Sequence, residues 1–336
     1  MSHYQPPLTL TAAMLALVAD ISEQVGRLSA LRDMALTPQL RRGNRIRTIQ
    51  ASLAIENNTL SLEQVTAVLD GKQVLGLPRE IQEVRNAFAA YEAMPGWQVA
   101  ARADLLLAHG LLMQGLIDDA GQFRQAGVGI YRGERLLHMA PPANRVGQLV
   151  DDLLAWLAST DLHPLIASCV FHYEFEFIHP FADGNGRMGR LWQTLILSQW
   201  RPVLAYLPVE TVIREQQEAY YAALQVADQQ SEATAFVEFM LHALQQALVE
   251  AAQSDQVNDQ VSDQVKRLLR VLKQQPALKA GELMQQLGLA HRPTFRSNYL
   301  NPALKAGLVE MTDAASPRSP VQKYRLTAQG RALADS

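Results

Sequence analysis

The sequence contains a single cysteine, Cys169, among 336 residues. One cysteine cannot form a disulfide within the chain, which favours a reducing compartment such as the cytoplasm. No run of about 18 or more uncharged apolar residues is present, so no membrane-spanning helix and no membrane partner are expected. The first residues also lack a basic segment followed by an apolar one, and no secretory signal is expected. Cys169 lies on an apolar helix face and is interpreted as a core residue.

Zinc-binding patterns are also missing, because the chain has neither a His-x-x-x-His spacing nor a pair of cysteines. Hydrophobic residues make up 48% of the chain and charged residues 19%, which fits a globular protein with a sizeable core. The length is compatible with two or three domains.

Three further helical patterns are predicted. Residues 9–33 have a helical period that places Leu10 and Met14 on one core-facing side. Ser61 with Gln64 predicts a capped helix start, and another helix is predicted over 214–225.

Charge is unevenly distributed. From Lys266 onward there are 12 basic and 4 acidic residues, a net charge of +8, whereas the remainder has 18 basic and 29 acidic residues, a net charge of −11. This contrast predicts two units with different partners.

The stretch from His179 to Arg190 reads His-Pro-Phe-Ala-Asp-Gly-Asn-Gly-Arg-Met-Gly-Arg and separates two apolar helical patterns. A Gly-Asn-Gly turn that opens a helix presents unpaired N–H groups, which favour a phosphate. Arg187 and Arg190 are three residues apart, so both guanidiniums are expected on one face of that helix, where they suit phosphate binding.

Two further groups in this stretch carry chemistry. Asp183 is a hard oxygen ligand suited to Mg²⁺ on a polyphosphate. His179 can exchange a proton near neutral pH. The residues alone therefore predict nucleotidyl or phosphoryl transfer.

Every fixed position of this stretch resembles the signature of the Fic family, His-Pro-Phe-x-Asp-Gly-Asn-Gly-Arg-x-x-Arg, and the resemblance extends over about residues 40–250. It implies transfer of AMP from ATP to a Ser, Thr or Tyr hydroxyl of a protein, with ATP and Mg²⁺ as substrate and cofactor. The implied roles are general base for His179, Mg²⁺ ligand for Asp183, anion cradle for Gly184, Asn185 and Gly186, and phosphate contacts for Arg187 and, at the γ-phosphate, Arg190. Phe181 is expected to anchor the loop.

The segment from Ser52 to Asn57 follows a predicted helix over 41–53 and is similar to the inhibitory motif of Fic proteins, Ser/Thr-x-x-x-Glu-Gly/Asn. On residues alone, Ser52 and Glu56 are an ordinary helical pair. The resemblance implies that the Glu56 carboxylate pairs with Arg190 and repels the γ-phosphate, so that ATP lies in a pose unfit for transfer.

Residues 127–139 alternate in a pattern that predicts a short β-hairpin, which Pro141-Pro142 ends. In the Fic family a hairpin flap at this position docks the target segment by strand addition. The resemblance implies that Ile130, Tyr131, Leu136 and His138 are the flap residues. The alternative is a surface hairpin without this role.

The remaining candidates are weaker. Tyr220 and Tyr221 resemble the paired tyrosines at the nucleotide base pocket of Fic proteins, although a packing role is equally open. His172 is interpreted as structural and His109 as a half-buried helix residue. Glu174 and Glu176 fall on different helix faces and are not expected to form an acid/base pair.

Residues 266–336 resemble a winged helix, with three helices followed by two strands, 308–311 and 323–326. The third helix presents Arg292, Arg296, Asn298 and Lys305, types suited to phosphates and base edges, so DNA is a possible partner. The competing interpretation is a protein contact or a homodimer. The repeat of Asp-Gln-Val over 254–265 is interpreted as a linker or a helical extension.

The predicted fold class is mainly α: a Fic-type helical domain with a small β-hairpin flap and a C-terminal winged helix-turn-helix domain. The predicted division is an N-terminal helical region (1–100), a catalytic core (101–252), a linker (253–265) and the winged helix (266–336). The predicted function is that of an autoinhibited protein adenylyltransferase that can also modify itself. Retention of Gly186 favours AMP over phosphate transfer. The alternatives are removal of AMP, transfer of another nucleotide, phosphate or phosphocholine group, and a DNA-binding regulator with a Fic sensing domain.

Overall fold

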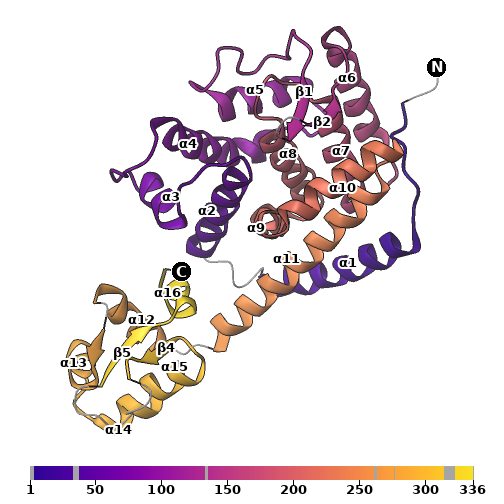
Figure 1. Ribbon diagram of the computed structural model, residues 1–336. Helices are drawn as coiled ribbons and strands as arrows, with labels where there is room; N and C mark the ends of the chain where they lie inside the picture. Colours follow the sequence, from indigo (N-terminus) through magenta and orange to yellow (C-terminus); the bar gives the residue numbers. More distant parts are fainter. Residues whose placement is uncertain are drawn as a thin grey trace. The chain divides into compact units, whose positions relative to one another are not determined.

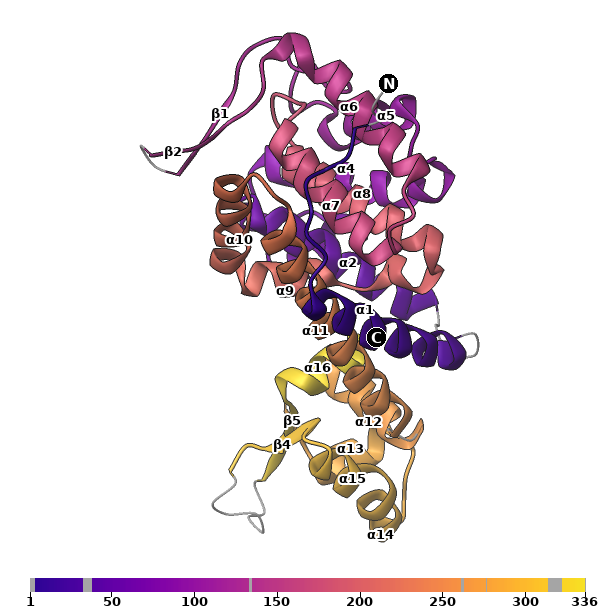
Figure 2. The ribbon, with the colours of Figure 1, turned by 90° about the vertical axis from the view of Figure 1, so that its right-hand side faces the viewer.

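The computed structural model describes residues 4–32, 38–132, 135–260, 263–275, 277–313 and 322–335. The chain divides into two compact units, Met1–Val249 and Glu250–Ser336. Both units consist mainly of helices, as the sequence predicts (Figures 1 and 2).

The larger unit contains helices and one hairpin, and its last helix continues past Val249 into the second unit. Its elements in chain order are α1 (Ala12–Arg32), α2 (Pro38–Ile55), α3 (Leu62–Leu69), α4 (Pro78–Ala93), the 3₁₀ turn η1 (Met94–Gly96), α5 (Arg102–Met113), β1 (Gly129–Arg132), β2 (Arg135–Met139), α6 (Ala143–Ser159), α7 (Pro164–Ile178), α8 (Asn185–Trp200), the 3₁₀ turn η2 (Pro202–Tyr206), α9 (Val209–Glu215), α10 (Gln217–Gln230) and α11 (Thr234–Gln260).

The α7 and α8 helices pack side by side in the centre of this unit (Figures 1 and 2). All residues of α7 are buried except Pro164, Glu176 and Phe177, as expected for a helix that is apolar on every side. The α5 and α2 helices pack against α8, and α6 packs against α7. The loop between α7 and α8 is the His179–Gly184 stretch, so the core of the unit holds this loop at both ends.

The hairpin of β1 and β2 is antiparallel, with Gly129 opposite Met139 and Ile130 opposite His138. The register shifts between Ile130 and Tyr131, which marks a β-bulge. Figure 2 shows the hairpin projecting from the body of the unit, and its strand β2 contacts α10. The predicted hairpin is confirmed, whereas the side chains of Ile130, Tyr131, Leu136 and His138 lie outside the described residues.

The first helix differs from the sequence prediction at its start. Leu10 was expected on the core face with Met14, but it is 50% exposed while Met14 is fully buried. The reason is that α1 begins at Ala12 and the Thr11 hydroxyl accepts a hydrogen bond from the Met14 amide. Leu10 therefore precedes the helix, and helical periodicity does not apply to it.

The turn after α2 follows the prediction more closely. The helix ends at Ile55, and Asn57 has a left-handed φ of 66°. Ser61 then caps α3 in a capping box with Gln64. The inhibitory-motif residues Ser52 and Glu56 thus stand on the last turn of α2 and just beyond it.

The second unit consists of helical segments and a small sheet. Its elements are α12 (Asp263–Gln274), β3 (Leu278–Lys279), α13 (Ala280–Gln286), α14 (Arg292–Phe295), the π-helical turn η3 (Arg296–Leu300), α15 (Asn301–Lys305), β4 (Val309–Met311), β5 (Lys323–Leu326) and α16 (Ala328–Asp335). The strands form one antiparallel sheet in the order β3-β5-β4. The topology confirms the predicted winged helix. The α14, η3 and α15 segments are consecutive and together make its third helix.

Two details were not predicted. The β3 strand has two residues, too few for an alternating pattern. The helix expected over 214–225 is divided at Gln216 into α9 and α10. Within the predicted linker, α11 continues to Gln260, in keeping with a helical extension. No helix among the described residues is long and apolar enough to cross a membrane.

Candidate functional site

The loop between α7 and α8 depends on two left-handed backbone positions. His179 caps α7 with φ 50° and ψ 61°, and Gly184 caps α8 with φ 84°. A histidine in this region is uncommon, and such conformations concentrate at functional sites. Gly184 is required for space as well, because an added Cβ would lie 2.6 Å from the Met113 sulfur.

Three side chains close the loop from inside. The Asn185 side chain accepts a hydrogen bond from the Phe181 amide and donates one to its carbonyl, both at 2.9 Å. The Phe181 ring is fully buried and stacks on the His109 ring, with centroids 3.6 Å apart. Phe181 therefore anchors the loop, as predicted.

His109 supports the same loop and is fully buried rather than half-buried as expected. The Gly121 amide donates to Nδ1 at 2.8 Å, so the neutral ring carries its proton on Nε2 and donates it to the Asp183 carbonyl at 3.0 Å. Burial lowers the pKa of His109 to about 4, which keeps this neutral form. The role follows from the three-dimensional packing, and the sequence pattern contains no sign of it.

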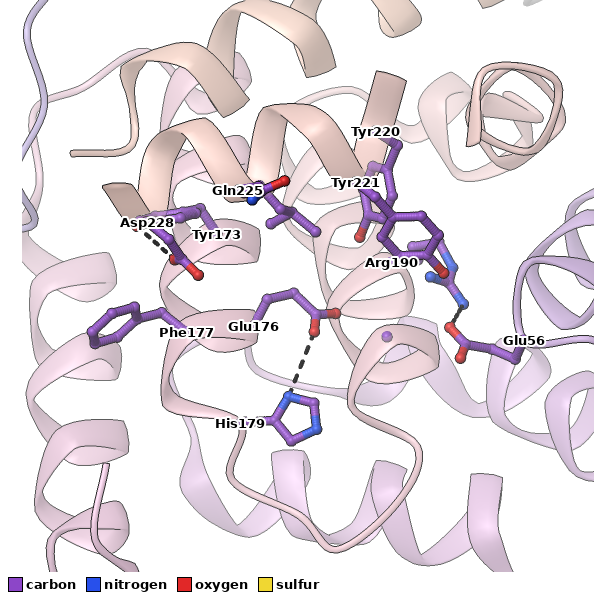
Figure 3. A pocket seen from close by; sticks show the side chains of 12 residues that line it. Glu56, Tyr173, Glu176, Phe177, His179, Arg190, Tyr220, Tyr221, Gln225 and Asp228 are labelled. Carbon is purple, nitrogen blue, oxygen red and sulfur yellow. Dashed lines mark hydrogen bonds and ion pairs between the residues drawn. The ribbon is translucent and has the colours of Figure 1, made fainter. Parts of the chain in front are cut away.

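Arg190, on the second turn of α8, is paired with the predicted inhibitory segment (Figure 3). Its Nη2 donates to Glu56 Oε1 at 2.7 Å and to the Ser52 carbonyl at 3.0 Å, and its Nε donates to the Ser52 hydroxyl at 3.0 Å. Arg190 is 2% exposed. Burial by itself would lower the pKa of Arg190, but the nearby Glu56 carboxylate raises it overall. The guanidinium is therefore a buried, permanently charged group paired with the Glu56 carboxylate.

Gly186 leaves room for this contact. An added Cβ at Gly186 would lie 2.3 Å from Glu56 Oε1 and 3.1 Å from the nearest Arg190 nitrogen. The absence of a side chain at this position thus allows Glu56 to reach the start of α8.

Asp183 and Arg187 form an ion-pair cluster with α4. The Arg187 Nη2 and the Gly184 amide both donate to Asp183 Oδ1, at 3.0 and 2.6 Å. Arg79 Nη2 donates to the other oxygen, Oδ2, at 3.0 Å. Glu83 lies 3.5 Å from Arg187 and 3.6 Å from Arg79. Neither Arg79 nor Glu83 was singled out from the sequence.

A pocket of about 190 Å³ opens at this loop. Its lining brings together residues from four segments of the larger unit: Glu56, Tyr173, Glu176, Phe177, His179, Gly186, Arg190, Tyr220, Tyr221, Leu224, Gln225 and Asp228 (Figure 3). The pocket therefore joins His179, Arg190 and Glu56, three residues predicted to act together.

The two tyrosines differ in their surroundings. Tyr220 is 2% exposed, and its hydroxyl lies 3.2 Å from His172 Nε2. Tyr221 is partly exposed on the pocket wall. His172 itself is fully buried and hydrogen-bonded to Gln193 at 2.7 Å, and burial lowers its pKa to about 3. The expected structural place of His172 is thus confirmed, and Tyr221 is the better placed of the pair to meet a ligand.

Glu176 belongs to the site although it was set aside in the sequence. Its Oε2 lies 3.8 Å from His179 Nδ1 (Figure 3). Glu174 instead accepts a hydrogen bond from the Tyr4 hydroxyl at 2.5 Å. The two carboxylates therefore have different partners. The i,i+3 spacing of Glu176 and His179 on one helix end was a usable signal.

Arg124 is a second residue that the sequence did not reveal. It is 2% exposed and donates to four backbone carbonyls, those of Ala126, Pro141, Ile178 and His179. The bond to His179 is 2.7 Å long. Arg124 therefore ties the two ends of the hairpin segment to the backbone of the loop.

One carboxylate of the site, that of Asp183, is suited to a hydrated cation. Among the described residues, no group of three or more His, Cys, Asp or Glu side chains gathers. Mg²⁺ commonly takes one or two carboxylates and completes its shell with water and substrate phosphates. A single carboxylate, Asp183, beside the start of α8 fits that pattern.

A buried helix that opens on a glycine turn, with a histidine and an arginine in one pocket, is an arrangement suited to a phosphate-binding α-helical protein. The sequence profile of the Fic/DOC family matches residues 100–197, and the profile of the "Filamentation induced by cAMP protein Fic-like, C-terminal domain" matches 263–327. The structure is similar to the crystal structure of a Fic family protein from Desulfovibrio desulfuricans G20, with a TM-score of 0.74. The two sequences are 65% identical, and the match covers 97% of this chain and 99% of that one. The chain belongs to the Fic family.

More distant relatives carry a named activity. The chain is 30% identical over 219 residues to "Protein adenylyltransferase Fic" of Aedes aegypti and 33% identical over 191 residues to "Protein adenylyltransferase fic-1" of Caenorhabditis elegans. These matches cover 60% and 53% of this chain but only 41% and 35% of the relatives. The structure of Fic-1 from C. elegans, at 23% identity and a TM-score of 0.56, shares the fold.

Proposed function

We propose that this chain is a protein adenylyltransferase, which transfers AMP from ATP to a Ser, Thr or Tyr hydroxyl of a protein. The observation that carries the proposal is the pocket in which His179, Gly186 and Arg190 meet. A proton acceptor, the amino-terminal end of a helix and a buried cation lie there within one small volume, as nucleotidyl transfer requires.

In the proposed reaction, His179 takes the proton of the target hydroxyl through Nε2, since Nδ1 faces Glu176. The hydroxyl oxygen forms a bond to the α-phosphorus while the bond to the bridging oxygen of the β-phosphate breaks, and pyrophosphate leaves with the electron pair. The Glu176 carboxylate stabilises the positive charge that His179 gains. Arg187 and the amides that open α8 stabilise the charge on the departing phosphates.

Mg²⁺ bound at Asp183 would neutralise phosphate charge. Asp183 would hold it through a carboxylate that the Gly184 amide orients, on a backbone whose carbonyl His109 holds.

The Glu56–Arg190 pair supports autoinhibition. Arg190 has its guanidinium occupied by Glu56 and Ser52, so the γ-phosphate would have to displace a carboxylate of like charge. Repulsion between two anions at one cation favours a different phosphate pose. On this proposal, Glu56 lowers transfer while leaving the catalytic loop intact.

The test is transfer of radiolabelled AMP from ATP to the protein itself and to lysate proteins, with the other three nucleoside triphosphates compared. Glu56→Gly should increase labelling at least tenfold, since the competing carboxylate is gone. Glu56→Gly combined with His179→Ala should label no more than the background. Labelling that survives the loss of His179 contradicts its role as the base, and labelling unchanged by Glu56→Gly contradicts inhibition.

A second reaction at the same site is removal of AMP. Glu56 lines the same pocket as His179 and can therefore orient a water molecule towards a phosphodiester. Incubation with purified AMP-modified protein distinguishes transfer of AMP from its removal. If removal is the main reaction, wild-type protein releases AMP from it and Glu56→Gly does not.

We further propose that the second unit binds DNA. Arg292, Arg296 and Asn298 are exposed on the third helix of the winged helix. An ion pair in this unit joins Arg325 and Glu310 at 2.6 Å, and in the described part of the unit neither Arg292 nor Arg296 is paired with a carboxylate. Both guanidiniums are thus available to phosphates and base edges.

Fluorescence anisotropy with a 30-base-pair duplex tests this partner. Arg292→Glu with Arg296→Glu should weaken binding and lower the slope of log affinity against log salt by about one for each lost phosphate contact. Arg270→Glu reverses one charge at an exposed position of α12 and serves as the control for each single reversal, Arg292→Glu or Arg296→Glu. Equal binding by all variants, or no salt-dependent binding by the wild type, contradicts the DNA role and favours a protein contact.

A further inference from the structure

Arg79 reaches the proposed cation ligand from a different part of the chain. It lies on the first turn of α4, 104 residues before Asp183, and its Nη2 donates to Asp183 Oδ2 at 3.0 Å. The other carboxylate oxygen, Oδ1, already accepts from Arg187 and from the Gly184 amide. Oδ2 is therefore the oxygen at which a cation has the least competition from the loop itself, and Arg79 holds it.

We propose that Arg79 is a competitor of the divalent cation, and that its guanidinium occupies the cation-binding oxygen of Asp183 until the cation displaces it. A guanidinium and Mg²⁺ both neutralise the carboxylate, but they cannot share one oxygen direction. The inference rests on the proposed function only in taking Asp183 as the cation ligand.

The surroundings allow this exchange. Arg79 and Asp183 have side chains that are 58% and 41% exposed, so a hydrated cation reaches the pair from solvent. Glu83 lies 3.6 Å from Arg79 on the same helix face and retains the guanidinium after it leaves Asp183. A surface hollow lined by Arg79, Gln82 and Gln114 provides space beside it.

The contrast with Arg187 supports a separate role for Arg79. Arg187 is 6% exposed and fixed between Asp183 and Glu83, so it is part of the loop. The pair of Arg79 with Asp183 is exposed on both sides, and exposed ion pairs contribute at most about 1 kcal/mol. Its release is therefore easy, and its effect on cation affinity is about fivefold or less.

The test is a titration of the full-length protein with Mn²⁺ alone, followed by water-proton relaxation, which needs no catalysis. Arg79→Ala should lower the dissociation constant two- to fivefold. The matched control is Arg42→Ala, because Arg42 forms a similar pair with Asp70 at 2.9 Å, with side chains 45% and 36% exposed. This control should bind Mn²⁺ as the wild type does.

Asp183→Asn identifies the site and should remove the saturable component. If it does not, Asp183 is not the ligand, and both this inference and the metal assignment in the proposed function fail. If Asp183→Asn removes binding but Arg79→Ala binds Mn²⁺ no more tightly than wild type, the competitor role alone is overturned. Weaker binding by Arg79→Ala also overturns it, because Arg79 then assists the cation.

Discussion

The guanidinium of Arg124 donates a hydrogen bond to the backbone carbonyl of His179 at 2.7 Å. It also binds the carbonyls of Ala126 and Pro141 on either side of the hairpin. One buried cation thus holds a left-handed histidine and the ends of the hairpin segment together, and burial lowers its pKa without removing its charge.

Arg124→Met is expected to lower the free energy of unfolding by about 3 kcal/mol, because it leaves several buried carbonyls without a donor. Arg124→Lys restores one or two donors and should lose less. Urea unfolding measures both. The exposed Arg145 on α6 supplies the control, Arg145→Met, with a change within about 0.5 kcal/mol. Equal stability of Arg124→Met and the control would show that the carbonyls find other partners.

Ser52→Ala is expected to raise AMP transfer several-fold if Glu56 inhibits. The change removes the hydroxyl acceptor of Arg190 Nε, 3.0 Å away, and an unsatisfied buried donor costs about 1–3 kcal/mol. The hydrogen bonds that hold Arg190 against the segment of Ser52 and Glu56 are therefore weakened. Ser52→Thr keeps the hydroxyl and should stay near wild type. Quantified self-labelling in both variants is the measurement, and activation by Ser52→Thr alone would contradict this account.

Glu176→Gln, made in a Glu56→Gly background, should lower kcat about tenfold while leaving KM for ATP within about twofold. The reason is that Glu176 faces His179 and acts on the base rather than on the phosphates. Steady-state kinetics with varied ATP separate the two constants. Glu174→Gln on the same helix is the control. A higher KM with unchanged kcat would place Glu176 in nucleotide binding instead.

Acid should destabilise the larger unit through its buried histidines. The pKa of His109 is about 4 in the folded protein, below the unfolded value of about 6.5. Between these two pKa values the unfolded chain binds more protons than the folded protein. The contribution of neutral His109 to the stability of the fold is therefore complete above pH 6.5 and is lost as the pH falls towards 4. The loss is on the order of 3 kcal/mol. His172 acts in the same direction.

The check is urea unfolding at several pH values between 4 and 7. The variant His109→Gln should be less stable at pH 7 but should show a shallower dependence on pH than the wild type. An identical pH dependence would mean that His109 titrates alike in both states.

The sequence predicted the parts of the fold and site that are local. Residues 179–190 are contiguous, so their order alone predicts the turn, the helix start and the phosphate groups. The hairpin and the capping box at Ser61 follow from equally short patterns. The winged helix was predictable because its apolar periodicity and basic third helix fall within one segment.

Residues that reach the loop from elsewhere could not be found in this way. Arg124 precedes His179 by 55 residues, and Arg79 precedes Asp183 by 104. Neither lies in a pattern that distinguishes it from a surface arginine, because its role depends on tertiary packing. The prediction that Leu10 is buried was wrong for a different reason. Its apolar character matches the helical period, but the helix begins after it.

The contact between Glu56 and Arg190 joins positions 134 residues apart within one compact unit. The carboxylate is therefore present at a fixed effective concentration, which dilution of the protein does not change. On the proposed function, a nucleotide therefore meets the same competitor at any protein concentration. Nucleotide supply, rather than the abundance of the protein, would then govern the exchange of Arg190 from glutamate to phosphate.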